Sequence, residues 1–370
     1  MSHTRWTLPA LATVLCATVL VVPVAGQEKG GTDDTGPYSV VPGWLKPVKE
    51  GFIEKGVAVF AESPDRILIA TSVEFPVPTR PSGPSFAAPE GSTNRALITV
   101  VDRNGNVKDV WTQWEGLMNM PHYVTESPYD PEKAVWVISR ETDQIFKFSN
   151  DGKQLLMTLG VARSLMPKNV NGQPTTLSDA THFGRPASMA FLPDGSFYVA
   201  DGYTNRRVVK FDKNGKFLME WGRAGTGPGE FAAVGEVHSI AIDAERRIYV
   251  GDRGNKRVQI FDENGKYLDE WDNIQGPSDL HATADGSIWV VSGVGNRLVK
   301  FDAKTGERKT YWGMYGTQPG MFDNPHFMSV DSEGNLYVAI FTNQQVGIEK
   351  YVPRPNADKS RLIGPDVRLK

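Results

Sequence analysis

Residues 238–271 read HSIAIDAERRIYVGDRGNKRVQIFDENGKYLDEW, and this stretch decides the fold. Four short stretches of apolar and aromatic residues alternate with turns rich in Asp, Gly and Asn. The pair Asn264-Gly265 suits a hairpin turn that needs φ > 0. The stretch therefore predicts four short strands joined by tight turns, with strands one and two antiparallel.

The same phrase recurs along the chain. Its third stretch ends on an apolar or aromatic residue, which in the six copies is Val101, Phe148, Phe211, Phe261, Phe301 and Tyr351. The intervals are 47, 63, 50, 40 and 50 residues. Four short strands repeated at this spacing are typical of a β-propeller, whereas a parallel sheet would need amphipathic helices that the sequence lacks. The sequence predicts an all-β fold, a six-bladed β-propeller.

The first 26 residues have the pattern of a secretory signal peptide. Arg5 supplies a positive charge, Leu8 to Val22 form an apolar run, and residues 24–26 are small. An uncleaved membrane anchor is the alternative, because about 20 apolar residues can span a bilayer. Pro23 favours cleavage, which also removes the only Cys. We expect a secreted or periplasmic protein without disulfides and without stable membrane association after cleavage.

The rest of the chain divides around the repeats. The expected segments are a signal peptide (1–26), an N-terminal segment (27–50), the propeller (51–352) and a C-terminal tail (353–370). One of the two flanking segments is expected to close the ring, and the sequence leaves both open. With 40 basic and 43 acidic residues, the net charge of −3 disfavours nucleic acid as a partner. We expect a monomer.

Aligning the six copies reveals a column of histidines. The alignment rests on one position in the second strand, occupied by Leu68, Trp136, Tyr198, Tyr249, Trp289 and Tyr337. Counting back to the start of the first strand gives Val57, His122, Ala187, His238, Ser278 and His326. Alternate blades of a six-bladed ring are about 120° apart, so three inner-strand imidazoles can converge on the channel axis.

Three converging imidazoles predict a metal site. Zinc binds His nitrogens, and a three-His site leaves one position for water or substrate. The predicted ligands are His122, His238 and His326. The alternative is that each is a hydrogen-bonded polar residue at the start of a strand. His182 and His281 lie outside the column and are expected to be ordinary hydrogen-bonded residues.

A further column lies four residues after the aligned second-strand position. It contains Arg140 and Arg253, and Tyr203 occupies it in blade three if one residue is inserted there. Because strands one and two are antiparallel, these side chains should face the same channel mouth as the histidines. A phenol and two guanidiniums beside a metal suit an anionic substrate. The alternative is that they form ion pairs or hydrogen bonds with acids such as Asp201 or Asp252.

Two phrases carry a family resemblance. The segments from Asp201 to Val208 (DGYTNRRV) and from Asp252 to Val258 (DRGNKRV) resemble NHL repeats, a likeness that covers roughly residues 50–352. With the three histidines, the chain resembles the peptidyl-α-hydroxyglycine α-amidating lyases. That resemblance implies a catalytic zinc held by three histidines and cleavage of an α-hydroxyglycine into an amide and glyoxylate.

The resemblance assigns roles residue by residue. It matches Pro121-His122, His238-Ser239 and Pro325-His326 to the zinc ligands, Tyr203 to the catalytic tyrosine and Arg253 to an active-site arginine. The chain also departs from the family, which carries an arginine where this chain has Ser72. Arg140, one blade further, is a candidate replacement.

A second departure concerns calcium. The family has an acid after its third histidine, and that acid contributes to a structural calcium site, whereas here Phe327 follows His326. The metal ligands thus resemble the family more closely than the surrounding residues do. We expect zinc, no structural calcium, and a substrate that diverges from the peptide.

These residues support competing functions. The leading hypothesis is a secreted, zinc-dependent, lyase-like enzyme whose substrate is small and anionic or peptide-like, with Tyr203 moving a proton and Arg253 and Arg140 holding a carboxylate. The alternative is a non-catalytic propeller that serves as a scaffold for protein or glycan, because fold alone does not establish catalysis. A calcium-dependent lactonase-type hydrolase is a weaker third hypothesis, against which the histidines argue.

Overall fold

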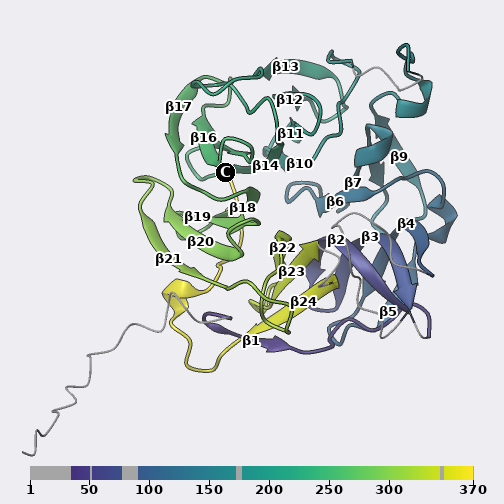
Figure 1. Ribbon diagram of the computed structural model, residues 1–370, viewed down its shortest axis with the longest axis vertical. Coiled ribbons are helices and arrows are strands. Elements are labelled where there is room, and N and C mark those ends of the chain that lie inside the picture. The colour runs from purple at the N-terminus through teal and green to yellow at the C-terminus, as the bar shows by residue number, and fades with distance from the viewer. Residues whose placement is uncertain (1–34, 51, 77–90, 172–176, 342–345, 370) are drawn as a thin grey trace, which may run out of the picture.

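The computed structural model describes residues 35–50, 52–76, 91–171, 177–341 and 346–369. These residues form six four-stranded antiparallel sheets arranged in a ring, as Figure 1 shows. The prediction of a six-bladed β-propeller is confirmed. The expected signal peptide, residues 1–26, lies outside the described residues.

Each blade runs from an inner strand to an outer strand. Blade one comprises β2 (Phe52–Ser63), β3 (Arg66–Pro76), β4 (Thr93–Val101) and β5 (Val107–Val110). Blade two comprises β6 (Pro121–Glu126), β7 (Val135–Ser139), β8 (Gln144–Phe148) and β9 (Leu155–Leu159). Blade three comprises β10 (Ser188–Phe191), β11 (Phe197–Asp201), β12 (Arg207–Phe211) and β13 (Phe217–Trp221).

The second half of the ring repeats this order. Blade four comprises β14 (Val237–Ile242), β15 (Ile248–Asp252), β16 (Arg257–Phe261) and β17 (Tyr267–Trp271). Blade five comprises β18 (Pro277–Thr283), β19 (Ser287–Ser292), β20 (Arg297–Asp302) and β21 (Arg308–Trp312). Blade six comprises β22 (Pro325–Val330), β23 (Leu336–Phe341), β24 (Val346–Pro353) and the N-terminal strand β1 (Tyr38–Val41).

Helical structure is confined to short 3-10 turns in the described residues. These turns are η1 (Thr112–Trp114), η2 (Arg140–Thr142), η3 (Arg163–Leu165) and η4 (Lys359–Arg361). Within the part of the chain that the structure describes, no helix has the length and apolar character needed to cross a membrane.

The repeated aromatic residues hold neighbouring blades together. Trp271 on the outer strand of blade four stacks on Phe301 of blade five, with ring centroids 5.1 Å apart. Trp111 meets Phe148 across the boundary between blades one and two at 5.5 Å. Such rings bury a large apolar area in the contact between blades, which explains why the sequence repeats them.

Lysines on the third strands cover the second-strand aromatic column. The ammonium groups of Lys147, Lys210, Lys300 and Lys350 lie 4.9–5.8 Å from the ring centroids of Trp136, Tyr198, Trp289 and Tyr337. These cation–π contacts recur in four blades, so they belong to the repeat itself.

The N-terminal segment closes the ring. Strand β1 pairs with β24, with Tyr38 opposite Pro353 and Val41 opposite Lys350. Tyr38 is fully buried, and its ring lies 5.5 Å from that of Trp312 in blade five. The C-terminal tail instead crosses to the inner strand of blade five, where Asp366 forms a bridge with Thr283. The pairing of β1 with β24 therefore closes the ring without a covalent link.

Candidate metal centre

A recurring backbone turn starts the inner strands. The phrases Met120-Pro121-His122, Gly276-Pro277-Ser278 and Asn324-Pro325-His326 each begin with a residue at positive φ, between 53° and 63°. The strand register then shifts at His122, at Ser278 and at the pair His326-Phe327. Such bulges redirect side chains, and proline has no N–H to lose from the ladder. The predicted strand starts agree within one residue except in blade one, where the long strand β2 begins at Phe52 rather than near Val57.

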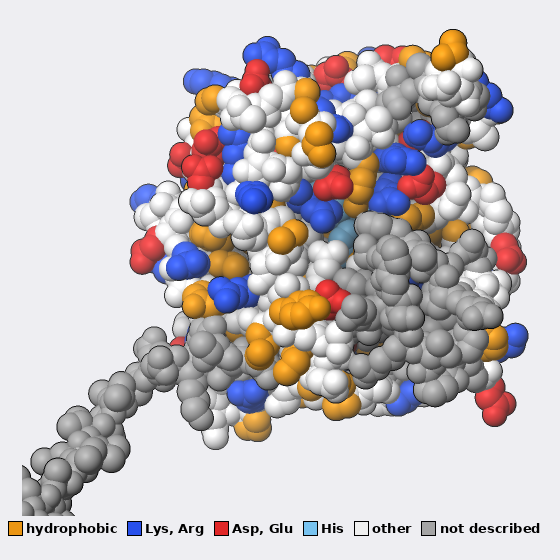
Figure 2. Space-filling view, in the orientation of Figure 1, with side chains coloured by type: hydrophobic (Ala, Val, Ile, Leu, Met, Phe, Trp, Pro, Cys, Tyr) orange, Lys and Arg blue, Asp and Glu red, His pale blue; other side chains and the backbone are white. Residues whose placement is uncertain are grey.

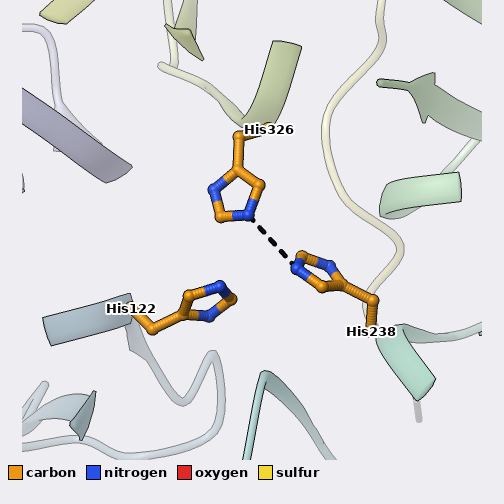
Figure 3. Close-up of side chains that lie close together, drawn as sticks. All are labelled: His122, His238 and His326. Carbon is orange, nitrogen blue, oxygen red and sulfur yellow. Dashed lines mark hydrogen bonds between the residues drawn. The ribbon is translucent and has the colours of Figure 1, made fainter. Parts of the chain in front are cut away.

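The three column histidines meet at the channel axis. Their nearest ring nitrogens all lie within 4.8 Å of one another, and the Nε2 atoms of His238 and His326 are 3.2 Å apart. All three side chains are buried. Figure 3 shows the rings pointing toward one another from separate strands, and in Figure 2 a histidine is visible near the middle of the face, beside lysine and arginine side chains.

Backbone carbonyls of blades one, three and five determine the tautomers of the histidines in blades two, four and six. Each imidazole has its Nδ1 atom 2.6–2.9 Å from a backbone carbonyl of the next blade. The pairs are His122 with Ala187, His238 with Ser278 and His326 with Val57. These carbonyls come from the remaining three positions of the column. An Nδ1–H that donates to a carbonyl leaves the Nε2 lone pair directed at the axis, as a metal ligand requires.

The centre holds more acceptors than donors. With all three Nδ1 hydrogens engaged, three Nε2 lone pairs face one another, and the Tyr203 hydroxyl lies 3.0 Å from Nε2 of both His122 and His238. One phenolic hydrogen cannot satisfy three acceptors. A tetrahedral ion with Zn–N bonds of about 2.05 Å would place two ligand nitrogens about 3.3 Å apart. The donor set therefore fits a zinc-type ion, and the 3.2 Å between Nε2 of His238 and Nε2 of His326 matches this spacing.

The imidazoles are neutral. Burial holds the pKa of His122 and His238 well below the ordinary value, and the nearby guanidiniums of Arg140 and Arg253 add to this effect. Burial likewise lowers the pKa of His326 to about 3. Neutral imidazole is the form that ligates metals, so no proton has to leave before an ion binds.

The predicted tyrosine and arginines lie at this same centre. The guanidinium of Arg140 lies 4.6 Å from the ring centroid of Tyr203, and burial raises the pKa of the phenol. Arg140 pairs with Glu141 at 2.8 Å, and Arg253 pairs more loosely with Glu236 at 3.6 Å.

Both arginines form the ion pairs with acids that the alternative predicted, but with Glu141 and Glu236. The two acids named as examples pair with other arginines. Asp201 pairs with Arg207 at 2.8 Å and Asp252 with Arg257 at 3.0 Å. Both pairs are buried within their blades. These two pairs therefore support the repeat.

Phe327 forms an apolar wall of the centre that sequence reasoning missed. Its ring centroid lies 5.3 Å from that of His122, 5.4 Å from His238 and 4.3 Å from His326. From the sequence we inferred only that position 327 lacks the acid that the resembling lyases carry there. In the structure the ring of this residue packs against all three imidazoles.

The other two described histidines lie outside the centre, as expected. His182 binds Asp179 through Nδ1 at 2.8 Å. His281 contacts Asp279 and Asp366 at 3.2 and 3.1 Å, the second of them from the C-terminal tail.

Known proteins share the fold and the repeats. Residues 178–272 match a family described as 6-bladed beta-propeller. NHL repeat-containing protein 3 from Mus musculus is 30% identical over 295 residues, which cover 74% of this chain and 80% of that protein. The chain therefore belongs to the NHL-repeat family of six-bladed β-propellers. A streptogramin B lyase structure covers 86% of this chain and 98% of its own with a TM-score of 0.51, but at 12% identity this likeness concerns the fold alone.

Some relatives bear the names of amidating enzymes. Peptidyl-alpha-hydroxyglycine alpha-amidating lyase 1 from Drosophila melanogaster is 34% identical over 130 residues, which cover 34% of this chain and 21% of that protein. The chain spans less than a fifth of the length of two relatives named amidating monooxygenases. The family thus includes proteins named as lyases, at modest identity.

Proposed function

We propose that this protein is a zinc-dependent lyase whose substrate carries a hydroxyl, a carboxylate and an amide nitrogen on one carbon. The observation that supports the proposal is the convergence of three neutral imidazoles, His122, His238 and His326, beside a phenol and two guanidiniums. Zinc in a three-His site lowers the pKa of an oxygen group that it binds. Ser72 and Phe327 replace residues of the resembling lyases, so we propose a substrate other than a peptide end.

The arginines orient the substrate. In this proposal Arg253 and Arg140 hold the carboxylate, because guanidinium matches carboxylate in a planar, two-point contact. Glu141 contacts Nε and one terminal nitrogen of Arg140, and Glu236 contacts one terminal nitrogen of Arg253. In this proposal other N–H groups of each guanidinium bind the ligand. Phe327 packs against all three imidazoles as an apolar wall.

Tyr203 moves the proton. The reaction breaks the C–N bond, and its electron pair goes to nitrogen while the hydroxyl oxygen forms the new C=O bond and gives up its proton. Because burial raises the pKa of Tyr203, the phenol is protonated and can donate to the leaving nitrogen. It then recovers the proton that the hydroxyl released. The products are an amide and a glyoxylate-type aldehyde acid.

Metal content and turnover test the proposal together. Protein purified without a metal-affinity tag should hold one zinc per chain, and His238→Ala should lose it. His281→Asn is the matched control, because His281 lies outside the centre. The loaded protein should release glyoxylate from a series of N-acyl-α-hydroxyglycines with short acyl groups. No stoichiometric metal in the wild type, or bound zinc without turnover across the series, would favour the scaffold alternative.

A further inference from the structure

Arg206 binds the loop that carries Tyr203 to the neighbouring blade. This arginine directly precedes β12 in blade three. The nitrogens of its guanidinium lie 2.6–3.3 Å from five backbone carbonyls, those of Gly202, Thr204, Asn205, Ala232 and Ala233. The first three carbonyls belong to the loop around Tyr203, and the other two belong to the segment before β14 of blade four. One side chain thus connects these two segments.

Both segments lead to atoms of the metal centre. The hydroxyl of Tyr203 lies 3.0 Å from Nε2 of His122 and from Nε2 of His238, and His238 stands at the bulge that begins β14. The backbones of the two segments also approach each other closely. A Cβ atom added at Gly202 would lie 1.9 Å from the carbonyl oxygen of Val237. The Tyr203 loop therefore packs directly against the start of β14.

The repeat does not account for Arg206. Arg207 and Arg257 occupy the same place in blades three and four, and each pairs with the buried aspartate of its own blade. The residue before each of them differs, because it is Arg206 in blade three and the exposed Lys256 in blade four. Of these two blades, the additional arginine stands in the one that carries the tyrosine.

The chemistry of guanidinium suits this place. Its five N–H donors lie in one rigid plane, so it can bind several carbonyls at once, whereas an ammonium has three donors on a flexible stem. Tyr203 stands between two of the bound carbonyls, those of Gly202 and Thr204. A loop held on both sides of the tyrosine keeps the phenol within hydrogen-bond distance of the imidazoles.

We propose that Arg206 is a positioning residue that holds the Tyr203 phenol at the metal centre by binding its loop to the segment before β14. Its importance for turnover rests on the proposed function, whereas the placement of the phenol does not. In the metal-free protein, a phenol held at Nε2 of His122 and His238 competes with an incoming zinc ion for the same nitrogens. Loss of Arg206 should therefore weaken this competition.

A double-mutant cycle in zinc affinity, measured by calorimetry, tests this role. Arg206→Gln should tighten zinc binding by at least about twofold, as expected for residues coupled in one hydrogen-bond network. In a Tyr203→Phe background no hydroxyl competes, so Arg206→Gln should leave the affinity unchanged. Arg206→Lys retains the charge with fewer donors and should fall between wild type and Arg206→Gln. Lys256→Gln is the matched control, since Lys256 occupies the same repeat position, and it should not change the affinity.

Nitrogen NMR of chelator-treated, histidine-labelled protein gives a second readout that needs no zinc. The Nε2 resonances of His122 and His238 in Arg206→Gln should move toward those of Tyr203→Phe, because the same hydrogen bonds are weakened. Equal effects of Arg206→Gln on zinc affinity in both backgrounds, or resonances unchanged from wild type, would overturn the inference. If Arg206→Gln does not fold, Arg206→Lys is judged by the same two criteria. If wild type binds no zinc or releases no glyoxylate, the lyase proposal fails, and the NMR comparison still decides where the phenol is held.

Discussion

Replacing Tyr203 by Phe should destabilise the metal-free protein and tighten its binding of zinc. Without a metal, the phenol is the group that lies within hydrogen-bond distance of Nε2 of both His122 and His238, at 3.0 Å each. Tyr203→Phe leaves these buried acceptors without that donor. Removing one partner of a buried hydrogen bond costs about 1–3 kcal/mol.

The metal-bound protein should not incur this cost. When an ion occupies the centre, the Nε2 lone pairs bind the ion and no longer need the phenol. The substitution thus destabilises the metal-free form and leaves the metal-bound form unaffected. The free energy of zinc binding should therefore become more favourable by the same amount, which corresponds to an affinity about 5- to 150-fold higher. The phenol and the metal compete for the same nitrogens.

Two measurements check this reasoning. Urea unfolding of chelator-treated protein gives the loss of stability in the metal-free state, and calorimetric zinc titration gives the gain in affinity. Tyr249→Phe serves as a control for the substitution, because Tyr249 is buried far from the centre and binds Asp243 at 2.9 Å. If Tyr203→Phe binds zinc more weakly than wild type, the phenol is a ligand rather than a competitor, and the argument is refuted.

Three further predictions concern pH and packing. Because burial already lowers the pKa of His326 to about 3, zinc affinity should change little between pH 8 and about 5 through this residue, and a steep loss near pH 6.5 in a zinc titration would contradict its neutral state. Burial alone would lower the pKa of His281, but Asp279 and Asp366 outweigh it and raise that pKa well above 6.5. Its contribution to stability is therefore present below about pH 6.5 and lost as the pH rises through the folded-state pKa, so His281→Asn should flatten this decline in pH-dependent unfolding. Trp312→Ala should cost about 3–5 kcal/mol in urea unfolding, whereas truncating the exposed Leu218 should change stability by less than about 0.5 kcal/mol.

The repeat made the fold and the position of the histidines predictable. Each copy has the same turn residues and the same buried aromatic position, so aligning the copies identifies equivalent points around a ring. His122, His238 and His326 stand at one such point on alternate blades. Rotational symmetry then brings them together, and the structure places their nitrogens within 4.8 Å.

Other features depend on contacts that do not repeat. The sequence left open which segment closes the ring, because both flanking segments lie outside the repeats. The structure decides it through Tyr38, whose ring is buried beside Trp312 and whose hydroxyl accepts a hydrogen bond from the Ile363 amide at 2.9 Å. That burial depends on contacts with blade five and the C-terminal tail, which are distant from Tyr38 in the sequence.

Six blades and the alternating histidines are predictable from the chain alone, because they follow from its periodicity. The chemical state of the centre depends on contacts that arise only in the folded ring. The carbonyls of Val57, Ala187 and Ser278 set the imidazole tautomers, and Phe327 packs against all three rings. Backbone carbonyls carry no sequence signal, and the direction of a side chain at a bulge depends on the strand beside it.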